Sequence, residues 1–207
     1  KTMLNGAPAE VDIVEPFVRG AKGRKRDVTL VLDDKARSTL VSGLDGLLSG
    51  PIKVKFEAAT ADTRRIEADL TDAKLDIPWA GWSKGAGVAA TVVFDLDIDG
   101  STSRLSDFEL TGKSFAVKGE VTLVKGSLSS ATFGSVQLNR GDNVSLTIKR
   151  SGKGYVIAAR GKSFDARSII RRYVSEDGAA ATADGGSTTV AVTMDVDALT
   201  GFHGETI

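Results

Sequence analysis

The sequence contains no cysteine and only one histidine, His203, and these absences remove most catalytic and metal-binding chemistry. Without cysteine there are no disulfides, thiolate nucleophiles or cysteine-based zinc sites, and such a chain suits the periplasm and the cytosol alike. With a single histidine, histidine-rich metal sites and most acid–base schemes lose their usual residue. The sequence therefore predicts a protein that is not an enzyme and holds neither a metal nor another cofactor.

An excess of charge of one sign is also missing, because Lys+Arg and Asp+Glu both number 27. A neutral chain has no overall attraction to nucleic acid or to an anionic membrane, so we expect no nucleic-acid partner. No run approaches the roughly 20 apolar residues of a membrane span, and the N-terminus does not resemble a signal peptide. Since the chain begins at Lys1 rather than Met, we expect it to be a fragment of a longer protein.

What the sequence does contain is a repeated strand pattern, with 23 glycines and only 4 prolines among 207 residues. Ile52, Val54 and Phe56 alternate with charged residues, which is typical of a strand with one apolar and one polar face. Turn signals such as Asp99-Gly100 separate such runs at intervals typical of antiparallel sheets. The predicted strands cover residues 28–32, 51–58, 66–70, 75–79, 94–99, 105–110, 115–124, 127–133, 136–138, 144–148, 155–159 and 190–196.

Two segments interrupt the alternation and predict short helices. Apolar residues fall at helical spacing from Asp33 to Leu48, and Asp165 is placed to cap a helical turn within Phe164 to Val174. No composition typical of a linker divides the chain, so residues 1–207 are interpreted as one β-rich segment. We expect a mainly β fold: an antiparallel, strongly curved and twisted sheet that forms an open, taco-like groove, with two short helices.

The apolar faces of these strands are the candidate binding surface. They carry small and medium aliphatic residues, and only 6% of the chain is aromatic, which suits a smooth lining. Alternation alone does not distinguish an open groove from two sheets closed on each other as a sandwich core. The residues expected to line a groove are Ile52, Val54, Phe56, Ile66, Leu70, Leu75, Ile77, Phe94, Leu96, Ile98, Val144, Leu146, Ile148, Val190, Val192 and Met194.

A cluster of acidic residues offers a weaker candidate site. Asp95, Asp97, Asp99 and Gly100 resemble the start of a calcium-binding loop. The position of the bidentate glutamate is occupied by Ser106, however, and the apolar residues between the aspartates fit a strand. We therefore interpret the aspartates as the polar face of a strand and expect no metal there.

A basic run offers a second candidate, because five of the eight residues from Arg19 to Arg26 are positively charged. Such a run can attract the phosphates of lipid or nucleic acid. No aromatic residues for stacking are interleaved, and protection of an exposed strand edge is the commoner use of such charges. Arg24, Lys25 and Arg26 remain candidate contacts for a lipid headgroup.

Four passages together resemble a known family. These are Glu67 to Ala73, Leu75 to Lys84, Gly161 to Arg167, and Gly201 to Gly204, and the run from Ala68 to Lys84 that leads into Trp82-Ser83-Lys84-Gly85 carries most weight. Their order and spacing are similar to those of the large AsmA-like proteins of Gram-negative bacteria, particularly the YhdP-type branch. The resemblance spans most of the chain but does not include a membrane anchor.

This resemblance implies a location, partners and a function. The parent protein would be anchored in the inner membrane through a region outside this chain, with a long periplasmic part that forms a β-rich trough. That trough would conduct phospholipid acyl chains between the inner and outer membranes and so contribute to outer-membrane lipid homeostasis. The expected partners are phospholipid and neighbouring segments of the parent chain. The alternative is a non-enzymatic structural β-sandwich module for envelope assembly or protein–protein docking.

Overall fold

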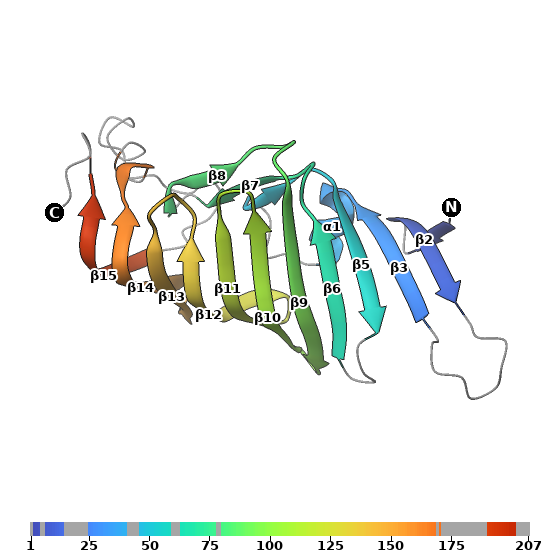
Figure 1. The fold of residues 1–207 in the computed structure, drawn as a ribbon. Helices are drawn as coiled ribbons and strands as arrows, with labels where there is room; N and C mark the ends of the chain where they lie inside the picture. The colour runs from blue at the N-terminus through green and yellow to red at the C-terminus, as the bar shows by residue number, and fades with distance from the viewer. Residues whose placement is uncertain are drawn as a thin grey trace.

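A computed structural model describes residues 2–4, 7–14, 25–40, 46–58, 63–77, 80–168, 170 and 190–201, and this part of the chain is mainly β (Figure 1). Its one helix of more than a turn, α1, spans Asp34–Leu40, and no helix in these ranges is long and apolar enough to cross a membrane. The strands are β1 (Thr2–Leu4), β2 (Ala7–Val14), β3 (Lys25–Leu32), β4 (Leu48–Ser49), β5 (Ile52–Ala58), β6 (Thr63–Asp69), β7 (Lys74–Ile77), β8 (Trp82–Lys84), β9 (Ala90–Asp99), β10 (Thr102–Gly112), β11 (Ala116–Val124), β12 (Ser127–Gln137), β13 (Asn143–Ser151), β14 (Gly154–Asp165) and β15 (Val190–Thr200).

Most strands join one large sheet with the order β1-β2-β3-β5-β6-β9-β10-β11-β12-β13-β14-β15. Neighbouring strands are antiparallel, as expected for strands joined by short turns, except that β15 runs parallel to β14. The sheet is open, with β1 and β15 at its edges (Figure 1). The prediction of a mainly antiparallel β fold is confirmed. The predicted strong curvature is not observed, because the large sheet is neither closed nor strongly curled.

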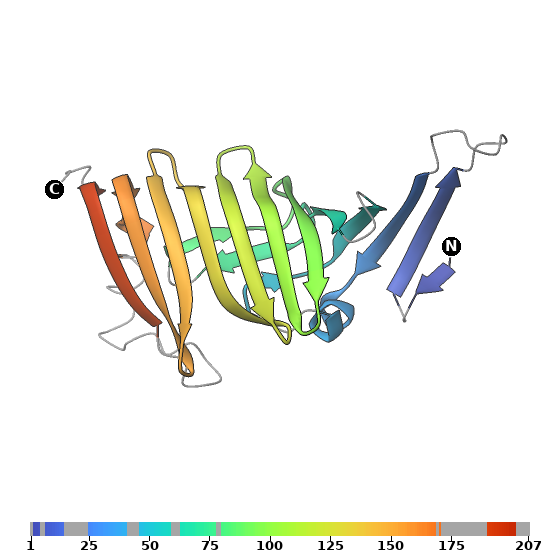
Figure 2. The same ribbon diagram turned by 90° about the horizontal axis from the view of Figure 1, so that it is seen from below.

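A small second sheet, with the order β4-β7-β8, packs on one face of the large sheet. Its strands run across those of the large sheet (Figure 2). Leu48, Ala80 and Trp82 from this region belong to the same buried core as the large sheet, and the Trp82 ring meets Phe115 edge to face at 4.9 Å. The covered face is therefore held by both apolar burial and an aromatic contact.

Several predicted boundaries differ from the structure. The first predicted helix is wrong at its end, because Leu48 lies in β4 and residues 41–45 lie outside the described ranges. The second is wrong at its start, because Phe164 and Asp165 end β14 and helical backbone begins at residue 167. From residue 171 to Val174 that prediction falls outside the described residues. The two strands predicted over 127–133 and 136–138 are one strand, β12, interrupted by a bulge.

Glycines permit two of the bulges in the large sheet. The register between β11 and β12 shifts between Lys118 and Gly119. The register between β13 and β14 shifts between Asn143 and Val144, and Val144 pairs with Gly161. An added Cβ would lie 2.1 Å from the Thr132 carbonyl oxygen at Gly119, and 2.2 Å from the Asn143 carbonyl oxygen at Gly161. Both glycines are therefore required by the close approach of a neighbouring backbone.

Gly161→Ala should lower the free energy of unfolding by about 1–3 kcal/mol, because the backbone of β13 must move away from the new methyl group. Gly134→Ala in β12 is the matched control, since nothing lies within 4 Å of its added Cβ. This control should change stability by less than about 1 kcal/mol, and in the stabilising direction. Urea unfolding of both variants measures the difference, and equal stabilities would contradict the bulge assignment.

Candidate functional site

The inner face of the large sheet, the face on which the small sheet packs, is apolar from strand to strand. Pairing aligns one row of side chains across seven neighbouring strands, from β9 to β15. At 4.7–4.9 Å between strands, the row extends for about 29 Å. No polar side chain interrupts it. Its members are Leu96, Leu105, Val121, Ala131, Ile148, Ile157 and Val192.

Burial along the inner face decreases away from the small sheet. Near the small sheet, at the upper ends of the strands in Figure 1, Val117, Val136 and Val144 are buried. At the lower ends, Ile98 is 59% exposed and Val192 is 50% exposed. We call the partly or fully exposed apolar residues on the inner face of the lower ends the open strip, which comprises Leu96, Ile98, Leu105, Val121, Leu123, Leu128, Tyr155, Val190 and Val192. Three polar residues lie among them on the same face, because Ser103 pairs with Ile98, Arg64 pairs with Leu96 and Arg150 of β13 pairs with Tyr155.

Three phenylalanines lie between the buried rows and the open strip. Phe94 and Phe108 stack with ring centroids 6.3 Å apart, and Phe108 meets Phe133 edge to face at 5.7 Å. Phe108 and Phe133 are brought together because Gly119, which pairs with both, has no side chain between them. These rings are partly buried and pack against the core, so they form the upper border of the open strip.

The predicted lining residues fall into three groups. Ile52, Val54, Ile66, Leu70, Val144, Leu146 and Ile148 are buried in the core. Phe56, Leu75, Ile77, Phe94, Leu96 and Met194 are partly buried against it, with Leu75 and Ile77 in the small sheet. Ile98, Val190 and Val192 are exposed.

Five members of the open strip were not predicted as lining residues, although all five lie in predicted strands. They are Leu105, Val121, Leu123, Leu128 and Tyr155. Bulges between Leu105 and Phe108 and between Thr122 and Leu123 change which residues share a face. A search for leucine and valine within those strands, without insisting on strict alternation, would have found all but Tyr155.

A buried lysine positions the small sheet. Lys84 in β8 is 4% exposed, and its ammonium donates to the carbonyl oxygens of Leu70 and Ala73, both at 2.7 Å, and of Gly85 at 3.1 Å. Burial lowers the pKa of Lys84, while the charges of Asp69 and Asp72 oppose that change. Because Leu70 follows β6, these bonds tie the small sheet to the large one.

A buried arginine connects the helix to the small sheet. Arg37 in α1 is 3% exposed and donates to the carbonyl oxygens of Leu48 at 2.6 Å and Gly50 at 2.9 Å. Asp34 accepts from Arg37 and from the Gly50 N–H, and the hydrogen bond from Arg37 is the main reason why the pKa of Asp34 is lowered. The contact fixes where β4 begins and so where the small sheet lies.

A buried carboxylate organises the loop between β12 and β13. Asp142 accepts the backbone N–H of Asn139 at 2.7 Å and that of Asp165 at 2.8 Å. Burial raises the pKa of Asp142, although these hydrogen bonds act in the opposite direction. Arg167 donates to Asp165 at 2.5 Å, so the neighbouring carboxylate is paired.

The remaining sequence candidates do not assemble into a site. Asp95, Asp97 and Asp99 lie in strand β9, and Asp95 forms an ion pair of 3.0 Å with Arg65. In the part of the chain that the structure describes, no group of three side chains could hold a metal ion. Arg24 and His203 lie outside the described residues, as do the side chains of Lys25 and Arg26, whose backbone begins β3.

Comparison of the chain with known protein families, with curated proteins and with solved structures finds no match.

Lys84→Met should lower the free energy of unfolding by about 2–4 kcal/mol, because it leaves buried carbonyl oxygens without a donor. Lys74→Met in β7 is the control, since Lys74 is exposed on the same small sheet. That variant should change stability by no more than about 0.5 kcal/mol. Thermal and urea unfolding measure both effects, and a stable Lys84→Met protein would show that the ammonium does not hold the small sheet.

Proposed function

We propose that this chain is a periplasmic segment of an AsmA-like, YhdP-type protein and that its inner face shields phospholipid acyl chains in transit between the inner and outer membranes. The observation that carries the proposal is the open strip, a set of exposed and partly exposed apolar residues on β9 to β12, β14 and β15 that the small sheet leaves uncovered. Exposed apolar patches of this kind mark interaction sites in soluble proteins. In this role the chain is not an enzyme.

The dimensions of the open strip support an acyl chain as its occupant. The paired row from Leu96 to Val192 extends over about 29 Å, and an acyl chain reaches about half of a 30 Å hydrocarbon core. The exposed members of this row lie toward its two ends, because Ala131, Ile148 and Ile157 between them are buried. Each buried CH₂ contributes about 0.8 kcal/mol, so even partial cover greatly lowers the cost of taking a lipid tail through water. Where the strip is lined by aliphatic residues, the energy of a lipid tail changes little from one position to the next, which favours movement over tight binding.

The buried rows take no part in this proposal. A hollow between Ala80 and the inner face near Val144 and Met194 has a cavity volume of about 30 Å³, which is room for about one water molecule. An acyl chain therefore has to lie on the open strip rather than beneath the small sheet. The same tight packing favours the alternative function, a structural module for docking or envelope assembly, in which the inner face is simply a core.

The proposal also assigns neighbouring segments of the parent chain as partners. β15 is the last strand of the large sheet, and its outer edge pairs with no strand among the described residues. It carries the inner face to that edge through Val190, Val192, Met194 and Val196, which pair with Tyr155, Ile157, Ala159 and Gly161 of β14. A further strand added there would lengthen the apolar strip.

Val192→Lys tests acyl-chain binding directly. The side chain is half exposed, so the fold should survive, while a charge in the strip should lower the phospholipid recovered with the purified chain by roughly tenfold. Mass spectrometry of lipid extracted from the purified chain provides the measurement. The matched control is Val156→Lys, because Val156 is 43% exposed on the opposite face of the neighbouring strand β14.

A second readout uses a photoreactive side chain at the same two positions. Crosslinking to phospholipid should occur from position 192 and not from position 156. Equal recovery of lipid from both lysine variants, or lipid absent from a well-folded native chain, would leave only the structural module.

A further inference from the structure

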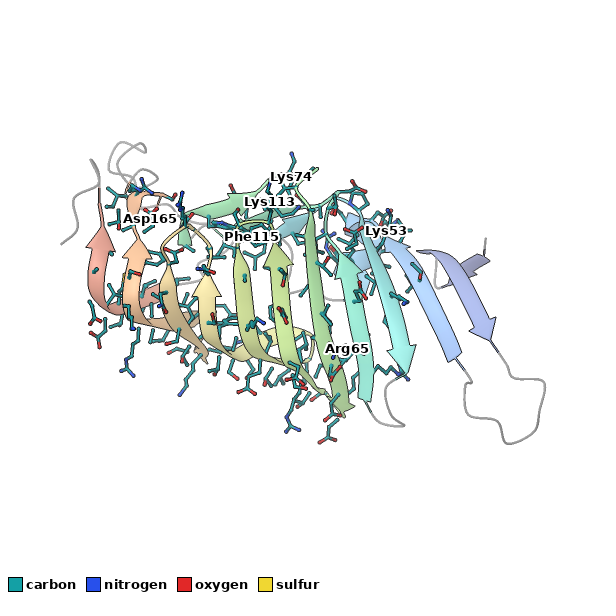
Figure 3. The ribbon with its side chains drawn as sticks, viewed as in Figure 1. Lys53, Arg65, Lys74, Lys113, Phe115 and Asp165 are labelled. Carbon is teal, nitrogen blue, oxygen red and sulfur yellow. The ribbon has the colours of Figure 1, made fainter. Side chains whose placement is uncertain are left out.

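A separate pocket lies on the outer face of the large sheet, at the upper ends of β10, β11 and β12. Its floor is the outer-face row of Thr111, Ala116 and Gln137, which pair across three neighbouring strands. Its walls are the hairpin loop 112–115 and the loop 139–141, and its cavity volume is about 340 Å³. We call it the rim pocket. Figure 3 shows Lys113 and Phe115 at this end of the strands, with Arg65 toward the opposite end.

The rim pocket has two cationic side chains and no acidic one. Lys113 comes from one loop and Arg140 from the other, and both line the pocket. Within the described ranges neither side chain forms an ion pair. The charges therefore converge from two different loops on one hollow without a counter-ion from the protein.

Two carboxylates close to the pocket in the chain already have partners. Asp142, which follows Gly141 of the lining, is 2% exposed and accepts the backbone N–H groups of Asn139 and Asp165. Glu109, on the outer face of β10, pairs with Lys118 at 2.9 Å and accepts from the Thr111 hydroxyl. Positive charge in the pocket is thus not cancelled by the acidic residues around it.

The lining also supplies neutral hydrogen-bond donors. Ser114 and Gln137 add a hydroxyl and an amide beside the two cations. Ammonium, guanidinium and hydroxyl donors form charge-assisted hydrogen bonds with phosphate oxygens. A volume of about 340 Å³ equals that of about eleven water molecules in the liquid, so it accommodates a phosphate together with a small organic group.

We propose that the rim pocket binds a phosphate group, with Lys113 and Arg140 as its charged ligands and Ser114 and Gln137 as neutral donors. The phosphate belongs either to a soluble phosphate compound or to a lipid headgroup. Because the pocket is on the outer face, this binding is independent of acyl chains on the open strip.

Titration of the full chain with inorganic phosphate, followed by calorimetry, tests the site. Lys113→Gln combined with Arg140→Gln removes both charges at similar side-chain length and should raise the Kd by at least about tenfold. The matched control combines Arg104→Gln with Lys153→Gln, which are exposed cations toward the lower ends of the strands. It should leave the Kd unchanged, and circular dichroism melting confirms that both double variants fold.

Co-sedimentation with phosphatidylglycerol vesicles then identifies the source of the phosphate. Loss of vesicle binding in the Lys113/Arg140 variant, together with loss of phosphate binding, supports a headgroup. Loss of phosphate binding alone supports a soluble compound. The site is overturned if the native chain binds no phosphate, or if the Lys113/Arg140 variant binds it as tightly as the native chain. Since Val192→Lys does not alter this pocket, failure here is distinguishable from failure of the acyl-chain proposal.

Discussion

The placement of the small sheet decides what the rest of the molecule presents to solvent. A large sheet that is apolar on one face must cover that face or leave it as an interaction surface. Here β4, β7 and β8 are two to four residues long and seal only the upper ends of the strands. Lys84 and the Trp82–Phe115 contact hold this cover in one position. The open strip is the part of the inner face that so short a cover cannot reach.

Much of the β architecture was predictable because side chains alternate along most strands. Ile66, Phe94 and Ile148 lie on the inner face as their alternation with charged residues indicates. β4 and β8 were not predicted, because two or three residues are too few to show a period of two. The helix boundary failed for a different reason. Leu44 and Leu47 continue the helical spacing of Ala36 and Leu40, but Leu47 lies in a turn and Leu48 pairs with Leu75 of β7, while the Arg37 side chain donates to the Leu48 carbonyl oxygen.

The distinction between the buried and open parts of the inner face could not be read from residue types. Val144 and Val192 are identical side chains at alternating positions of predicted strands, yet one is 4% exposed and the other 50%. The difference arises from the position of the strand in the sheet, since Val144 lies in β13 between β12 and β14, whereas Val192 lies in β15, which has a neighbouring strand on one side only among the described residues. The rim pocket was not predictable from the sequence either. Lys113 and Arg140 are far apart in sequence, and only the pairing of β11 with β12 brings their loops to one pocket.

The exposed hydrophobic residues are distributed differently on the two faces of the large sheet. Single exposed valines are common in soluble proteins, and Val31, Val124 and Val156 are of this kind on the outer face, where their strand neighbours are largely charged or polar. Val190 and Val192 differ because Tyr155 and Ile157 lie beside them on the same face, and beyond Arg150 the partly exposed aliphatic residues of β12 to β9 lead toward Ile98. Burying this surface would contribute about 25 cal/mol per Å², so leaving it uncovered has a cost in stability. An uncovered strip on one face, beside isolated valines on the other, is the arrangement that the proposed reversible binding of an apolar ligand requires.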